Sequence, residues 1–350
     1  MLKAFWKKHT LNFKQASGTS RGIFTEKDSW YIFIYEENSP DIKGIGECGL
    51  LKGLSCDDLP EYEGKIEEVC SNINHYTNTL HMNLKQYPSI RFGLEMALLD
   101  LKNKGNHILF PTKFTEGKSP ININGLIWMG EPSFMKKQIK DKLKQGFSCL
   151  KMKIGAIDFE EELSIIKEIR NEFPVDEIEL RVDANGAFSK DDAPMKLHRL
   201  AEYQLHSIEQ PIKAGQWEEM ALLCKNTPLP IALDEELIGI HETNEKQILI
   251  ETIKPQYIIL KPSLLGGIES CNEWINIAEQ NNCGWWVTSA LESNVGLNAI
   301  AQWTYTLNNP MPQGLGTGQL YTNNFESPLE VKKGFLNFDR ENNWDLSHML

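Results

Sequence analysis

The chain has 350 residues, of which 41% are hydrophobic and 24% are charged, and its net charge is -12. This acidic balance excludes a general nucleic-acid binder, which needs a basic surface. The longest apolar runs are short and interrupted by charged residues, which excludes a membrane-spanning segment. The length allows either two domains or one large barrel with additions.

The cysteines and the N-terminal stretch indicate the cellular compartment. The seven cysteines are odd in number and include no C-x-x-C pair. We therefore expect reduced thiols in a cytoplasmic protein rather than a disulfide framework or a zinc site. The first residues, MLKAFWKKHTLNF, contain no apolar core followed by a small-residue cleavage site, so we expect no export signal there.

The first hundred or so residues predict an α+β unit. Residues 24–37 read as a β-strand, and residues 41–50 read as its hairpin partner. Residues 88–105 predict an amphipathic helix, because their apolar side chains recur at helical spacing and Gly105 is a stop signal.

From about residue 120 onward, short apolar strands alternate with helical stretches. A doubly wound sheet would need a Gly-rich phosphate turn after its first strand, and ININGLIWMGEP does not supply one. Repeated βα units favour a (β/α)8 barrel instead. The eight expected strands cover residues 121–128, 149–154, 179–185, 206–211, 231–236, 257–263, 284–290 and 314–318.

These elements predict an α/β protein with three parts. An N-terminal α+β capping domain is expected at residues 1–115, and a (β/α)8-type barrel at residues 116–320. The C-terminal segment, residues 321–350, lies beyond the eighth strand. We expect it to pack back on the capping domain and complete it.

Charged side chains stand at the carboxyl ends of consecutive predicted strands, where barrel enzymes place their active sites. From Lys153 onward they are 30, 26, 25 and 27 residues apart, each about one βα unit. We therefore expect them to lie side by side around the barrel mouth. In chain order they are Lys151 and Lys153, Asp183, Glu209, Asp234 with Glu235, and Lys261.

The three carboxylates of this set point to a metal site. Asp183, Glu209 and Asp234 could not all stay ionised together in a dry site without a compensating cation. Oxygen ligands without His or Cys favour Mg²⁺ over zinc. Lys153 and Lys261 would flank the metal, and a nearby cation lowers the pKa of a lysine enough for it to act as a base. Each residue alone has an ordinary structural explanation, but all of them in register favour one shared site.

The motifs together resemble the enolase superfamily, and specifically its muconate lactonizing enzyme subgroup. The resemblance implies that a substrate carboxylate binds Mg²⁺, a base removes the α-proton, and the metal stabilises the enediolate. The matching motifs are K-x-K at Lys151 and Lys153, the Asp of D-A-N at Asp183, the Glu of E-Q-P at Glu209, D-E at Asp234 and Glu235, and the lysine of K-P-S at Lys261.

Within the subgroup, the chain is most similar to the o-succinylbenzoate synthases of menaquinone biosynthesis. These lyases dehydrate 2-succinyl-6-hydroxy-2,4-cyclohexadiene-1-carboxylate. The resemblance implies that Lys153 abstracts the α-proton and returns it to the departing hydroxyl. It also implies that Lys261 stays protonated over the opposite ring face. Lys151 would lower the pKa of Lys153 and hold the enediolate.

Four further residues are candidates for substrate contact. Ser289 ends the seventh expected strand and offers a donor to a carboxylate. Arg21 lies in GTSRG, where the family's capping loop closes, and would face a distal carboxylate such as a succinyl tail. Asn185 and Glu235, in the D-A-N and D-E motifs, complete the set.

The sequence also bears on which substrate class within the subgroup the protein uses. Dipeptide epimerases of the subgroup carry D-x-D near the eighth strand to hold an α-ammonium, whereas GLGTGQL at residues 314–320 contains no acid. An N-succinylamino acid racemase or an epimerase of another dipeptide class remains the alternative, because it would use the same two lysines. A metal-free hydrolase with paired carboxylates would leave the lysines unexplained. We expect a small-molecule carboxylate as partner, no nucleic acid and no membrane, and leave a homo-oligomer open.

Overall fold

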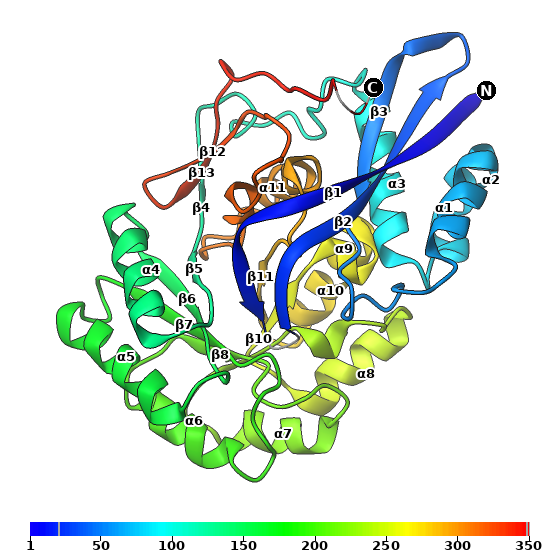
Figure 1. Ribbon diagram of the computed structural model, residues 1–350. Coiled ribbons are helices and arrows are strands. Elements are labelled where there is room, and N and C mark those ends of the chain that lie inside the picture. The colour runs from blue at the N-terminus through cyan, green and yellow to red at the C-terminus, as the bar shows by residue number, and fades with distance from the viewer. Residues whose placement is uncertain (20–21, 348, 350) are drawn as a thin grey trace.

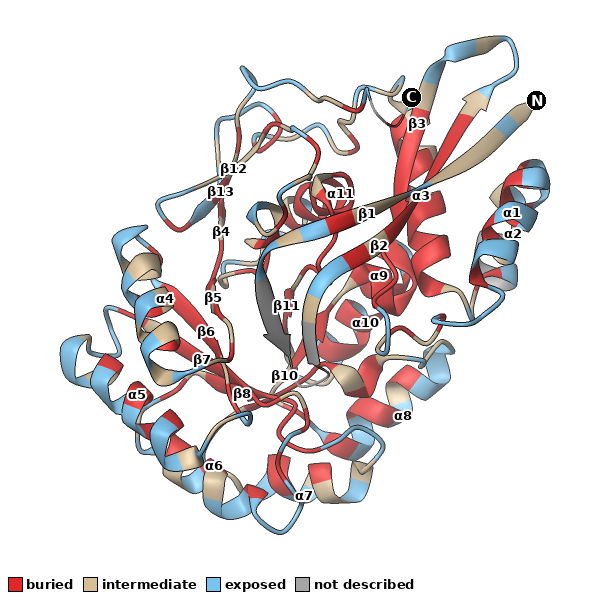
Figure 2. Ribbon diagram, in the orientation of Figure 1, coloured by how far each residue is buried: buried red, intermediate tan, exposed pale blue. Residues whose placement is uncertain are grey.

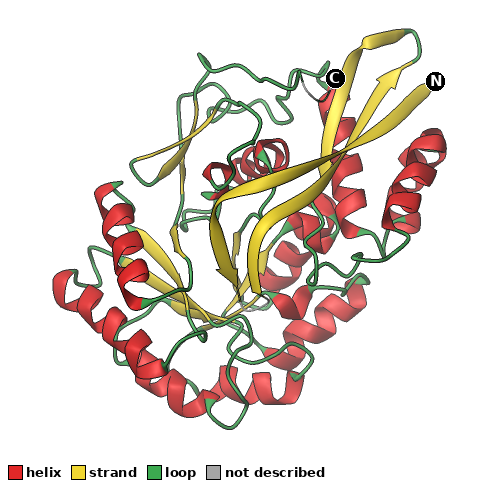
Figure 3. Ribbon diagram, viewed as in Figure 1, coloured by secondary structure: helices red, strands yellow, loops and turns green. Residues whose placement is uncertain are grey.

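The computed structural model of the protein describes residues 1–19, 22–347 and 349. Seven parallel strands form a curved sheet, helices cover its outer face, and a long antiparallel sheet from the N-terminal part reaches toward its mouth (Figure 1). Strands and helices are therefore segregated, with the parallel strands inside and the helices outside (Figure 3). None of the described helices is long and apolar enough to cross a membrane. The cysteines are free, as predicted.

The N-terminal part combines an antiparallel sheet with three helices, which confirms the α+β prediction. The sequence predicted β2, β3 and α3 but missed β1. In the WYIFIY run of β2, Ile32 and Ile34 pack against the helices, while Tyr31 and Phe33 pack on the other face. Both faces of β2 are therefore covered, which explains why its apolar run is continuous. The elements are β1 (Leu2–Thr19), β2 (Gly22–Glu36), β3 (Ser39–Cys48), α1 (Tyr62–Ser71), α2 (Ile73–Asn83) and α3 (Pro88–Lys102).

Two glycines let β3 touch the backbone of α3. A Cβ on Gly46 would lie 1.8 Å from the carbonyl oxygen of Gly93, and a Cβ on Gly44 would lie 2.0 Å from that of Ala97. We expect Gly46→Ala to lower the free energy of unfolding by about 3 kcal/mol, because sheet and helix must separate. Urea unfolding measures this change.

The matched control is Gly64→Ala in α1, where an added Cβ meets nothing within 4 Å. This variant is expected to raise the free energy of unfolding by about 0.5 kcal/mol, because alanine is the better helix former. If Gly46→Ala were as stable as the wild type, close backbone packing of β3 on α3 would be contradicted.

The parallel sheet has the strand order β5-β6-β7-β8-β9-β10-β11 and forms the buried centre of the molecule (Figure 2). Its strands are β5 (Gly125–Ile127), β6 (Cys149–Lys153), β7 (Glu179–Asp183), β8 (Ser207–Glu209), β9 (Ile231–Leu233), β10 (Tyr257–Leu260) and β11 (Gly284–Val287). The surrounding helices are α4 (Pro132–Lys144), α5 (Phe159–Glu172), α6 (Ala193–Ala201), α7 (Trp217–Asn226), α8 (Thr243–Ile253), α9 (Pro262–Leu265), α10 (Gly267–Gln280) and α11 (Asn294–Thr306), with 3-10 turns η1 (Glu235–Leu237) and η2 (Thr317–Gln319).

The first and eighth strands of the barrel differ from the prediction. The expected strand 121–128 is divided into β4 (Ile121–Asn122), which pairs outside the barrel sheet, and β5. In place of the expected eighth strand at 314–318, residues 313 and 314 form two isolated parallel bridges, Ile123 with Gln313 and Thr288 with Gly314. Three glycines within these five residues disfavour an extended strand. The bridges still close the barrel between β11 and the segment before β5.

The C-terminal segment returns to the capping part, as predicted. The amide of Lys14 in β1 donates to the carbonyl of Leu320 at 2.8 Å, and the amide of Thr322 donates to that of Asn12 at 2.9 Å. Phe325 packs in a cluster with Tyr31 of β2. Further along, β12 (Leu329–Lys332) pairs with β13 (Phe335–Phe338), and β13 pairs with β4.

A buried carboxylate fastens the cap to the barrel. Glu47 of β3 is fully buried and accepts hydrogen bonds from the amides of Ser293 and Gly296, at 3.0 and 2.9 Å. These amides lie at the N-terminus of α11, where a carboxylate satisfies open donors and complements the helix dipole. The hydroxyl of Ser29 donates to Glu47 at 2.8 Å. This anchor sets where the cap sheet meets the barrel.

Candidate active site

The barrel strands bring the predicted charged residues together at their carboxyl ends. Lys153 lies opposite Asp183 in the register of β6 and β7, and Asp183 lies opposite Glu209 in that of β7 and β8. Lys151 is two residues before Lys153, so both side chains point to the same face of β6. Lys151 is only 5% exposed. The observed register therefore agrees with the spacing of these residues along the sequence.

Two lysine ammonium groups bridge the three carboxylates. Lys151 Nζ lies 3.0 Å from Asp183 Oδ2 and also contacts Glu209 Oε2. Lys261 Nζ contacts Asp234 Oδ2 and lies 3.9 Å from Glu209 Oε1. The three carboxylates are almost completely buried. Lys151 lies between Asp183 and Glu209, and Lys261 lies between Glu209 and Asp234, so each lysine offsets the repulsion between two neighbouring carboxylates.

Burial and these contacts shift the pKa values in opposite directions. Burial disfavours the charge on Lys151, but Asp183 and Glu209 outweigh it, and the pKa of Lys151 lies above its ordinary value. Burial likewise opposes the charge on Lys261, but Asp234 and Glu209 raise its pKa. The pKa of Asp183 is lowered, because Lys151 and its neighbouring lysines overcome the effect of burial. Burial and then Asp183 hold the pKa of Glu209 well above its usual range.

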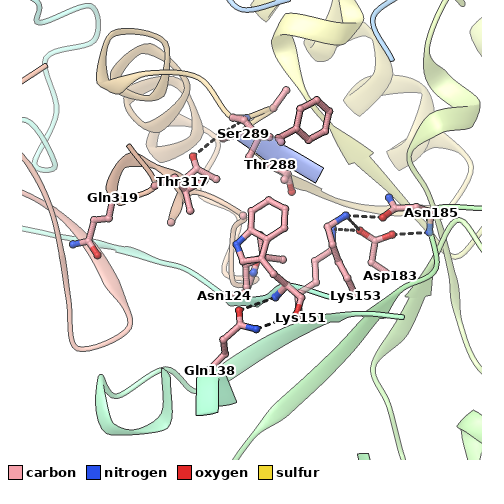
Figure 4. Close-up of a pocket in the computed structure, with 18 of the residues that line it drawn as sticks. Asn124, Gln138, Lys151, Lys153, Asp183, Asn185, Thr288, Ser289, Thr317 and Gln319 are labelled. Carbon is pink, nitrogen blue, oxygen red and sulfur yellow. Dashed lines mark hydrogen bonds and ion pairs between the residues drawn. The ribbon is translucent and has the colours of Figure 1, made fainter. Parts of the chain in front are cut away.

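Lys153 has different partners from the other two lysines. Its Nζ donates to Asn185 Oδ1 at 2.6 Å and to Asp183 Oδ2 at 3.3 Å (Figure 4). The side-chain amide of Asn185 donates in turn to Glu235 Oε1 at 3.1 Å. The backbone amide of Asn185 donates to Asp183 Oδ1 at 3.0 Å, and its φ of 44° is a left-handed conformation that asparagine tolerates well. The D-A-N turn therefore places its amide beside Lys153.

Gln210 is a site residue that the sequence analysis missed. It is fully buried directly after Glu209 and has a φ of 38°, which is rare for a glutamine. Its Oε1 accepts from the amides of Asp234 and Glu236, at 3.2 and 3.3 Å. Its Nε2 donates to the carbonyl of Ile212 and to Glu236 Oε2, both at 3.0 Å. Gln210 thus holds the turn that carries Asp234, and the E-Q-P motif was the available signal.

A cavity of about 350 Å³ opens above these groups. Lys153 and Lys261 both line it, as do Asn185 and Glu235. The cap and its following loop contribute mainly apolar side chains on the other side, so the cavity is closed by two separate parts of the chain. The contributing residues from the N-terminal part are Lys14, Gln15, Phe24, Leu51 and Leu54.

Two polar residues of the cavity wall were also missed. Asn124 Oδ1 and Thr288 Oγ1 are buried and have no hydrogen-bond partner within the described part of the chain. Ser289, a predicted substrate contact, also lines the cavity, but its hydroxyl shares a 2.6 Å hydrogen bond with Thr317 (Figure 4). Arg21 lies outside the described residues. No spacing pattern in the sequence marks Asn124 or Thr288, because their unsatisfied oxygens appear only in the folded structure.

The carboxylate oxygens at this site are of the chemical type that a divalent cation such as Mg²⁺ prefers. Three buried carboxylates meet at neighbouring strand ends, and the two oxygens of Glu209 face the ammonium groups of Lys151 and Lys261. Among residues 1–19, 22–347 and 349, however, no three Asp, Glu, His or Cys side chains are already arranged around one metal position. Lys151 and Lys261 occupy the space between the carboxylates instead. Metal binding would require these lysines to move from the carboxylate oxygens.

Comparison with known proteins identifies the family. Residues 135–341, more than half of the chain, match the family described as "Enolase C-terminal domain-like". The chain belongs to the enolase superfamily. Within this superfamily it falls in the muconate lactonizing enzyme subgroup, as predicted.

One curated relative and two solved structures are similar to this enolase-superfamily chain. The o-succinylbenzoate synthase of Desulfotalea psychrophila is 44% identical, over 95% of this chain and 97% of the relative. The crystal structure of MenC from the same organism has a TM-score of 0.85 and 41% identity, covering 96% of this chain and 99% of that one. A dipeptide epimerase of Enterococcus faecalis, crystallised with Mg and L-Leu-L-Tyr, has a TM-score of 0.83 at 21% identity, over 96% and 97% of the two chains. The likeness to the dipeptide epimerase concerns the fold alone.

Proposed function

We propose that the protein is an o-succinylbenzoate synthase, a lyase that dehydrates 2-succinyl-6-hydroxy-2,4-cyclohexadiene-1-carboxylate to 2-succinylbenzoate in menaquinone biosynthesis. The observation that carries the proposal is the 44% identity to an enzyme of that name over nearly the full length of both chains. The cavity supports it, because lysines on β6 and after β10 line the same cavity.

Lys153 is proposed as the base and then the acid. Its Nζ lines the cavity, where it takes the α-proton of the ring carboxylate carbon. The same nitrogen then delivers a proton to the departing hydroxyl. One group therefore serves both steps, and the ring becomes aromatic when water leaves.

Lys261 and Lys151 are proposed to supply fixed positive charge. Burial disfavours the charged form of Lys261, but Asp234 and Glu209 outweigh this effect and raise its pKa. The Lys261 ammonium therefore stays protonated beside an anionic intermediate. The carboxylates around Lys151 act in the same direction on its pKa. Lys151 would hold negative charge on the substrate carboxylate from the β6 side.

We propose Asp183, Glu209 and Asp234 as the ligands of Mg²⁺. Their chemistry fits a hard cation that prefers oxygen ligands. When bound, the ion would supply positive charge that stabilises the negative charge developing on the substrate carboxylate. The E. faecalis relative was crystallised with Mg, which is consistent with this choice.

Substrate contacts remain a proposal for Ser289, Asn185, Glu235 and Arg21. The buried oxygen of Asn124 and that of Thr288 add two groups to the cavity wall that a substrate could satisfy. The domain limits at 115/116 and 320/321, the cytoplasmic location and a homo-oligomer also stay predictions.

The test is an absorbance assay with the cyclohexadiene substrate and Mg²⁺. We expect loss of the diene absorbance and formation of 2-succinylbenzoate, identified by mass spectrometry. A folded protein that leaves this substrate unchanged would sink the proposal.

The second candidate is racemisation of N-succinylamino acids, or epimerisation of a dipeptide. Lys153 and Lys261 both line the cavity and could exchange a proton on either face of an α-carbon. Incorporation of solvent deuterium into an N-succinylamino acid, faster than conversion of the diene, would favour it. The two assays therefore discriminate between the candidates.

A further inference from the structure

The contacts of Lys153 leave one direction of its nitrogen unassigned. A primary amine is tetrahedral, with the Cε bond and three further directions. Asn185 Oδ1 takes one of them at 2.6 Å and Asp183 Oδ2 takes another at 3.3 Å. Both partners are acceptors and therefore require N–H groups. A neutral amine has only two N–H groups, so its lone pair must occupy the third direction.

Glu235 decides which end of the Asn185 amide faces the lysine. A carboxylate only accepts hydrogen bonds, so it requires the NH₂ group of Asn185, which it receives at 3.1 Å. The carbonyl oxygen is then turned toward Lys153. If the amide flipped, its NH₂ group would face the lysine and could donate to the lone pair, which would block the base.

We propose that Asn185 and Glu235 are positioning residues that aim the lone pair of Lys153 at the substrate. Glu235 locks the amide of Asn185, and the locked amide holds one N–H of Lys153. After proton uptake the contact with Asn185 remains, and the newly acquired N–H points at the departing hydroxyl. The inference rests on the proposed role of Lys153 as base. It replaces the direct substrate contact proposed above for Asn185 and Glu235 with a positioning role.

The experiment compares Glu235→Gln, Asn185→Ala and the double variant with the wild type. Glutamine can accept or donate, so it removes the lock at nearly constant shape. We expect kcat for the cyclohexadiene substrate to fall by about 10- to 100-fold in each variant. KM and the calorimetric Kd of 2-succinylbenzoate are expected to stay within about twofold, because the substrate loses no contact.

The double variant tests whether Glu235 acts through Asn185. If it does, Glu235→Gln has no further effect once Asn185 is alanine, so the double variant matches Asn185→Ala. Glu273→Gln is the matched control, since its carboxylate pairs with Lys246 on the outer helices and it should retain wild-type kcat. Circular dichroism verifies folding, and Asn185→Ser takes the place of Asn185→Ala if the alanine variant does not fold.

Three results would overturn the inference. The first is a rise in KM and in the product Kd with kcat unchanged, which assigns both residues to substrate binding. The second is recovery of kcat at tenfold higher Mg²⁺, which assigns them to the metal. The third is additive loss in the double variant, which gives them independent roles.

The positioning role can still be tested if the protein does not convert the diene. A wild type that does not convert the diene would refute the dehydratase but not the positioning role. The variants are then compared by exchange of the α-proton of an N-succinylamino acid with deuterated solvent. Slower exchange with unchanged binding supports the inference, and an unchanged exchange rate overturns it.

Discussion

Lys153→Ala is expected to lower kcat for dehydration by about 10³-fold or more, because general base catalysis contributes roughly 10²- to 10⁴-fold and the same residue also acts as the acid. The variant keeps the contacts of Lys151 with Asp183 and Glu209, so the protein should fold. Steady-state kinetics with the diene substrate, together with circular dichroism, measures both expectations.

Lys190→Ala is the control for this prediction. Lys190 is exposed and pairs with Glu219 at 3.4 Å on the outer surface of the barrel. Exposed ion pairs contribute little to stability, so neither activity nor folding should change. If Lys153→Ala retained more than about a tenth of wild-type kcat, another group would have to be the base.

Removal of metal by EDTA is the second large effect, and we expect it to reduce activity by more than about 10³-fold. Without the cation, the negative charge that develops on the substrate carboxylate would lose its metal partner. Addition of excess Mg²⁺ should restore activity in the wild type. Asp234→Asn should weaken restoration, because a neutral amide is a poorer ligand than a carboxylate.

Metal binding should also release protons, which gives a readout independent of turnover. Burial and Asp183 raise the pKa of Glu209, so its carboxyl holds a proton more readily than an ordinary glutamate. A ligand carboxylate must lose that proton, so Mg²⁺ affinity should rise with pH until the raised pKa is passed. Calorimetry in two buffers of different ionisation enthalpy measures the release. Full activity in EDTA with no proton release would contradict a metal-dependent mechanism.

Local sequence pattern predicted the elements whose formation depends on neighbours along the chain. The helix at 88–105 is observed as α3, and the strand at 24–37 as β2. In contrast, β1 was missed, and the eighth strand was wrong. Gln313 and Gly314, at the start of this segment, are held by bridges to Ile123 and Thr288, which lie far away in sequence.

The sequence by itself determined which charged residues meet. A period of two placed Lys151 and Lys153 on one face of β6, and the βα repeat brought Asp183 opposite Lys153 and beside Glu209. These relationships follow from backbone geometry, which is regular and local. They hold whatever rotamers the side chains adopt.

Only the tertiary structure decided what those side chains contact. The amide of Asn185 faces Lys153 because Glu235, which begins η1 after β9, takes its other end. Gln210 secures the turn of Asp234 from the neighbouring strand. Such contacts depend on rotamers and on packing between segments distant along the chain, and no periodicity in the sequence encodes them. The fold thus supplies the orientation of groups whose presence the sequence already specified.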